Sequence, residues 1–97
     1  MAKLDIVVEL KDGAHSPSVK IDHLNVPLNA DRKGSVTIPG TLGDGSNHNL
    51  TLLFQGPAGA KASSTVTCGT AQLCQIKEST MTVASEPYRT TWKDFKL

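Results

Sequence analysis

The sequence predicts an all-β fold, a small antiparallel β-sandwich of about seven or eight short strands, with residues 1–97 forming a single domain. Three observations indicate this class. Apolar and polar residues alternate over short segments, Gly, Pro, Asn and Asp interrupt these segments at short intervals, and no segment shows the period of a helix. Sandwiches and small barrels share these features. A sandwich is favoured because each inward face carries several aliphatic side chains.

Each expected strand is defined by its alternation and by the turn signal that ends it. The segment 3–10 stops at the Lys-Asp-Gly turn of residues 11–13, and 34–38 is closed by Pro39 and Gly40. The segment 49–55 is broken by the GPAGAK stretch that follows it. The remaining expected strands are 18–24, 64–68, 74–78, 80–85 and 88–95. The side chains expected to point inward are Leu4, Ile6, Val8, Leu10, Val19, Ile21, His23, Val36, Ile38, Leu50, Leu52, Phe54, Val66, Cys68, Cys74, Ile76, Met81 and Val83.

Composition argues against several classes of function. Apolar residues make up 38% of the chain and only four residues are aromatic, so we expect an aliphatic core. The ten basic and nine acidic residues are interleaved, and without a Lys/Arg run no nucleic-acid partner is expected. No apolar run approaches about 20 residues, so no membrane insertion is expected. The first residues also lack the apolar run and cleavage site of a signal peptide.

The two cysteines, Cys68 and Cys74, flank the expected turn of a hairpin. If they face each other, the same register sets Val66 against Ile76 on one apolar face, so the hydrophobic pattern and the cysteine placement agree. The sequence therefore predicts a Cys68–Cys74 disulfide, which would stabilise the fold by about 2.4 kcal/mol. The alternative is two reduced cysteines that act as small inward apolar residues, since a metal or redox pair would favour the absent C-x-x-C spacing. An extracytoplasmic or secreted location is expected only if the disulfide forms.

The predicted architecture resembles that of immunoglobulin-like domains, and the likeness is one of architecture alone. In those domains the cysteines that join the two sheets are much further apart in sequence than Cys68 and Cys74. Their core tryptophan lies between the cysteines, whereas Trp92 follows both. No family is therefore assigned from the sequence.

The C-terminal segment 88–95 holds three of the four aromatic residues. One interpretation is an exposed aromatic strip flanked by basic side chains, which would bind another protein or stack on a sugar. The other is a last strand that closes the sandwich and buries Trp92 in the core. A mixed outcome would keep Trp92 in the core and place Tyr88 or Phe95 near the surface. The candidate contact residues of this segment are Tyr88, Arg89, Trp92, Lys93 and Phe95.

The longest glycine-rich connection, residues 38–50, is the second candidate site. Its polar side chains, above all Asp44, Asn47 and His48, are suited to contact a polar ligand. A calcium loop of the EF-hand type needs acidic or amide residues at every second position, and this stretch has one acid, so no metal is predicted. The Pro-Gly and Asp-Gly pairs favour the alternative, a plain hairpin or crossover loop.

Catalysis is not predicted, because no nucleophile motif occurs and nothing selects a working pair among the scattered acids. No catalytic residue and no cofactor are assigned. The leading hypothesis is a non-enzymatic binding module with a protein partner. One alternative is a small-ligand domain for carbohydrate or metal, and another is a structural subunit that associates through exposed edge strands. The oligomeric state is not predicted.

Overall fold

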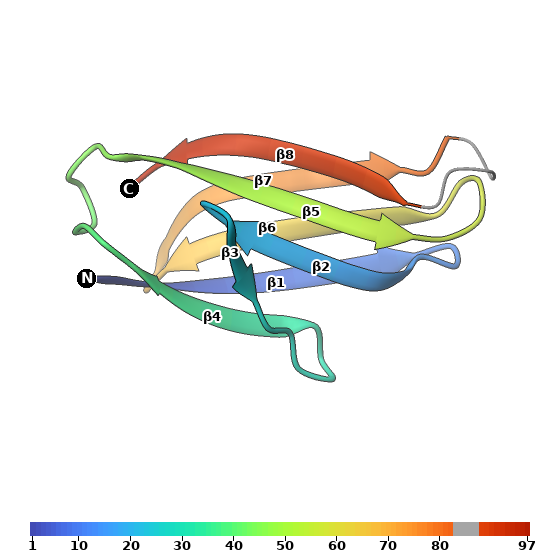
Figure 1. Cartoon of the computed structure of the whole chain (residues 1–97), viewed down its shortest axis with the longest axis horizontal. Coiled ribbons are helices and arrows are strands. Elements are labelled where there is room, and N and C mark those ends of the chain that lie inside the picture. Colours follow the sequence, from blue (N-terminus) through green and yellow to red (C-terminus); the bar gives the residue numbers. More distant parts are fainter. Residues whose placement is uncertain (83–87) are drawn as a thin grey trace.

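The computed structural model describes residues 1–82 and 88–97, which form two four-stranded sheets packed face to face (Figure 1). All strand pairs are antiparallel. The strands are β1 (Ala2–Lys11), β2 (His15–Ile21), β3 (Leu24–Val26), β4 (Lys33–Ile38), β5 (Asn47–Gln55), β6 (Lys61–Cys68), β7 (Ala71–Thr80) and β8 (Arg89–Lys96). The strand orders are β4-β1-β6-β7 and β3-β2-β5-β8. The prediction of a small all-β sandwich is confirmed.

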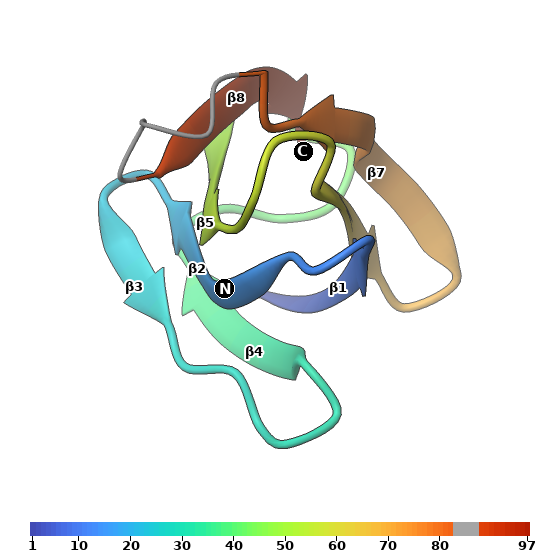
Figure 2. The same ribbon diagram turned by 90° about the vertical axis from the view of Figure 1, so that its right-hand side faces the viewer.

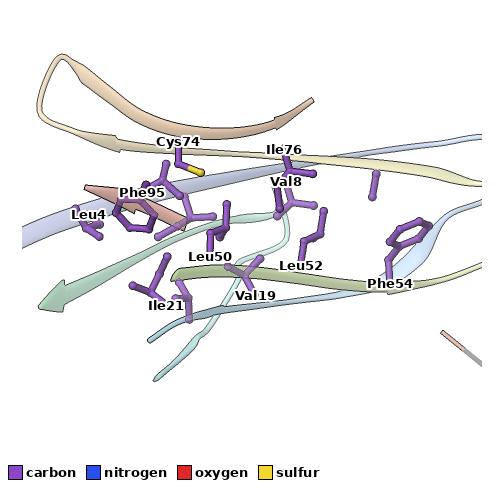
Figure 3. Close-up of a cluster of buried hydrophobic side chains, with 14 of the residues drawn as sticks. Leu4, Val8, Val19, Ile21, Leu50, Leu52, Phe54, Cys74, Ile76 and Phe95 are labelled. Carbon is purple, nitrogen blue, oxygen red and sulfur yellow. The ribbon is translucent and has the colours of Figure 1, made fainter. Parts of the chain in front are cut away.

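The core lies between the two sheets and consists of the inward row of each strand. Leu50, Leu52 and Phe54 of β5 are fully buried, and they face Leu4 and Val8 of β1 across the interior (Figure 3). This burial follows from the alternation of side chains along a strand. Most of the expected inward residues are buried, although Leu10, Val36 and Cys68 are only partly so.

Strands β7 and β8 belong to different sheets and lie against each other at one side of the sandwich (Figure 2). The hydroxyls of Ser79 and Thr91 are hydrogen-bonded there. Lys93 Nζ also donates a hydrogen bond to the carbonyl oxygen of Gln75, at 3.1 Å. These contacts join β8 to the neighbouring sheet.

One expected strand is wrong in extent, and another falls partly on residues that the structure does not describe. The segment 18–24 is interrupted by a two-residue turn, in which Asp22 and His23 have φ angles of 50° and 71°. His23 is therefore exposed in the turn, not inward on a strand, and residues from Leu24 onward form β3. The expected strand 80–85 has no separate counterpart in the described part, because β7 runs to Thr80 and residues 83–87 lie outside the described residues.

The predicted register of the β6–β7 hairpin is also wrong. Cys68 lies opposite Ala71, because the chain reverses in a two-residue turn that begins at Gly69, with a φ of 60°. A bulge then shifts the ladder, so that Cys74 lies opposite Val66. The two cysteines share the inward side of the hairpin without facing each other.

The predicted Cys68–Cys74 disulfide is accordingly absent, and both cysteines are free in the structure. Cys74 is buried, with its side chain directed into the core (Figure 3), while Cys68 is partly exposed. Burial raises the pKa of the Cys74 thiol. A raised pKa lowers the thiolate fraction, and the thiolate is the species that reacts with alkylating reagents.

We expect both cysteines to take up an alkylating label in denaturant without prior reduction, giving two added labels by intact mass. In the folded protein, we expect Cys74 to react more slowly than Cys68, because Cys74 is less accessible and burial raises the pKa of its thiol. Peptide mapping after a short pulse of iodoacetamide measures the two rates. If labels are taken up only after reduction, the protein contains the disulfide. That result would contradict the observed hairpin register.

Candidate functional site

Trp92 lies on the outer face of the β3-β2-β5-β8 sheet, with 66% of its surface exposed. It pairs with Thr51 of β5, and Thr51 pairs in turn with Lys20 of β2, so these three side chains form one row across the sheet. Phe95 has the opposite parity on β8 and is only 6% exposed. The interpretation that buries Trp92 in the core is therefore wrong, and Phe95 fills that role.

The five candidate contact residues of the C-terminal segment do not form one surface strip. Tyr88, with 50% of its surface exposed, precedes β8. Arg89 and Lys93 have the parity of Phe95, and Lys93 is bonded to the neighbouring edge strand β7. Phe95 contributes its ring to the interior instead of to a contact surface (Figure 3). Of the predicted strip, the surface aromatics are thus Tyr88 and Trp92.

Next to Trp92, three polar side chains are held by one another on the same outer face. Asn49 lies opposite Asp94 in the β5–β8 ladder and donates from Nδ2 to Asp94 Oδ1, at 2.9 Å. Thr51 Oγ1 donates to Asn49 Oδ1, also at 2.9 Å. These bonds orient the amide and the carboxylate before any ligand arrives. Asp94 is two residues from Trp92, about 7 Å along the strand.

The glycine-rich connection is a tightly bonded loop around Asp44. The Asp44 carboxylate accepts hydrogen bonds from the Ser46 hydroxyl, the Ser46 backbone N–H and the Thr41 backbone N–H. These three bonds, in that order of importance, lower the pKa of Asp44 to about 2. Gly40 permits the arrangement, since its φ is 112° and a Cβ there would lie 2.6 Å from Asp44 Oδ2. Asp44 thus maintains the loop conformation.

His48 connects this loop to the β2–β3 turn. Its Nε2 lies 2.8 Å from Ser46 Oγ, and its Nδ1 lies 2.5 Å from Asp22 Oδ2. Asp22 Oδ1 accepts a second bond from the backbone N–H of Asn49, at 2.8 Å. The His48 ring also packs 5.7 Å, centroid to centroid, from the buried ring of Phe95. His48 therefore links the polar rim to the core.

Ser46, His48 and Asp22 have the connectivity of a serine–histidine–aspartate triad, but the hydroxyl proton is directed elsewhere. A serine hydroxyl has one proton to donate, and Ser46 Oγ donates to Asp44 Oδ1 at 2.6 Å. His48 Nε2 lies 2.8 Å from the same oxygen, and the ring tautomer decides which atom donates in that contact. The serine proton is thus not directed at His48, as the general base of a triad would require.

The residues at this end of the sheet border an open hollow. Its lining is formed by Asp22, Asn47, His48, Asn49 and Asp94. Two of the predicted loop candidates, Asn47 and His48, are therefore part of it, whereas Asp44 is outside this lining and supports the loop through its hydrogen bonds. Asp22 and Asp94 were missed by the sequence analysis, because only the pairing of β5 with β2 and β8 brings them together.

We expect the pKa of Asp44 to be measurable near 2, against its ordinary value of 3.8. Because the folded-state pKa is lowered, the ionised carboxylate stabilises the fold above about pH 4, and this contribution is lost as the pH falls towards 2. NMR titration of the side-chain carboxyl carbons measures the midpoint. In Asp44→Asn, the thermal midpoint should fall less steeply between pH 4 and pH 2 than in the wild type. A midpoint near 4 for Asp44 would contradict the bonded loop.

Within residues 1–82 and 88–97, no group of three or more His, Cys, Asp or Glu side chains is placed to hold a metal ion. The same residues include no helix long and apolar enough to cross a membrane. The chain matches no protein-family model, and comparisons with curated proteins and with solved structures gave no match.

Proposed function

We propose that the protein is a non-enzymatic binding domain whose contact surface is the outer face of the β3-β2-β5-β8 sheet around Trp92. The observation that carries the proposal is the 66% exposure of this tryptophan in the middle of a regular strand. An indole ring exposed to water leaves a large apolar area unburied, and tryptophan is among the commonest anchors of binding surfaces.

The surroundings of Trp92 support a binding role. The polar groups beside it, on Thr51, Asn49 and Asp94, are already fixed by mutual hydrogen bonds, which lowers the entropy lost when a partner binds. Tyr88 offers a second exposed aromatic ring. The hollow at the end of the sheet adds hydrogen-bonding groups next to the aromatic surface.

A non-enzymatic role is favoured over catalysis by the direction of the Ser46 hydrogen bond. A nucleophilic serine would need its hydroxyl proton to point at His48, but that hydroxyl donates to Asp44. The Ser46–His48–Asp22 chain is better explained as the structure that holds the loop onto the sheet.

The test is capture of partners from an extract of the source organism on immobilised wild-type protein, Trp92→Ala and Thr65→Ala. Thr65 is a matched control because it is a strand residue paired with Gln75 in the opposite sheet. We expect wild type and Thr65→Ala to retain the same molecules, analysed as peptides and as released glycans, and Trp92→Ala to lose them.

Because Trp92 is a surface side chain, Trp92→Ala should change the free energy of unfolding by no more than about 0.5 kcal/mol in urea titration. Loss of capture could then not be attributed to unfolding. Equal retention by all three proteins would place the contact surface elsewhere.

A further inference from the structure

We infer that the ligand of this face is a neutral carbohydrate, with one sugar ring stacked on Trp92 and its hydroxyl groups bonded in the hollow lined by Asp22, Asn47, His48, Asn49 and Asp94. This inference rests on the proposed function and specifies the chemistry of the partner.

The polar setting of the indole favours a sugar over an apolar protein surface. The row that crosses the sheet at Trp92 continues through Thr51 to Lys20, and Asp94 follows on the same side of β8. Energetically dominant aromatics in protein interfaces are ringed by further contacts that exclude water once the partner is bound, whereas the neighbours of Trp92 on this face are the polar side chains of Thr51, Lys20 and Asp94. An isolated, open indole among hydroxyl and carboxylate groups suits a pyranose, whose C–H face packs on the negative π face while its rim of hydroxyls needs hydrogen-bonding partners.

The hollow supplies those partners at a suitable distance. Asn49 Nδ2 donates to Asp94 Oδ1. Among the described residues no group occupies the second carboxylate oxygen of Asp94, so this oxygen can accept a hydrogen bond from a sugar hydroxyl. The exposed side-chain amide of Asn47 offers both a donor and an acceptor. Trp92 is about 7 Å from Asp94 along β8, which is about the width of one sugar ring plus its hydroxyl groups.

The charges around the site indicate a neutral ligand. Asp22 and Asp94 carry the negative charges of the lining. Lys96 lies opposite Asn47 in the ladder, and Lys20 lies opposite Thr51, so two positive charges border the same face. The formal charges of these two carboxylates and two ammonium groups balance, which favours a ligand without net charge.

The bonded loop keeps the hollow in one conformation. Asp22 is held through both carboxylate oxygens, by His48 Nδ1 and by the Asn49 backbone N–H. His48 is in turn held through Ser46 and Asp44. A site whose polar groups are fixed beforehand distinguishes sugars that differ in the position of one hydroxyl.

The test is an array of neutral and acidic oligosaccharides probed with the full 97-residue protein, followed by calorimetric titration of the neutral glycan that binds most tightly. We expect binding to a subset of the neutral glycans. Trp92→Ala should weaken it at least tenfold, Trp92→Phe should retain part of the affinity because a ring remains, and Asp94→Asn should weaken it several-fold. Thr65→Ala, which changes a strand residue of the opposite sheet, is the matched control and should bind as the wild type does.

An array without neutral-glycan binding, binding to acidic glycans only, or equal affinities of wild type and Trp92→Ala would each overturn the inference. If the array is negative while capture from the extract still depends on Trp92, a protein partner replaces the sugar and the binding function stands. If capture is independent of Trp92 as well, the proposed function fails together with the inference.

Discussion

The burial of the inward row of β5 determines much of the rest of the structure. Leu50, Leu52 and Phe54 are fully buried, and burial of each such side chain contributes roughly 1.5–3 kcal/mol. A register slip of one residue on β5 would turn this row to solvent, so its pairing with β2 and β8 is strongly specified. Since Leu52 lies opposite Thr91 and His48 opposite Phe95, the ladder also sets the parity of β8. Trp92 is exposed because Phe95 is buried.

The polar end of the sheet depends on the same constraint. The inward parity of His48 brings its ring against Phe95, while both ring nitrogens find oxygen partners in Ser46 and Asp22. A partly buried ring with both nitrogens bonded costs little, because none of its polar atoms is left unsatisfied. A continuous series of contacts therefore joins the core to the loop and to the β2–β3 turn. Because these contacts hold the glycine-rich connection in one conformation, it can line a defined hollow.

Sequence periodicity was sufficient for the fold class and for most of the core. Alternation identified the inward residues of β1 and β5, and it correctly separated Trp92 from Lys93 on opposite sides of β8. It could not tell which side is inward, because each side of that strand offers one large aromatic ring. That choice depends on pairing with β5, some 40 residues away, and no local pattern encodes it.

The local errors have a similar origin. The hairpin register was inferred from apolar matching, whereas the two-residue turn at Gly69 and the bulge in β7 fix it differently. Asp22 and Asp94 belong to the candidate site only through strand pairing.

The most direct test of the exposed position of Trp92 is acrylamide quenching of the fluorescence of this single tryptophan. We expect red-shifted emission from Trp92, quenched in the folded protein nearly as efficiently as in urea. Blue-shifted emission protected from the quencher would place Trp92 in the core and contradict this exposed position.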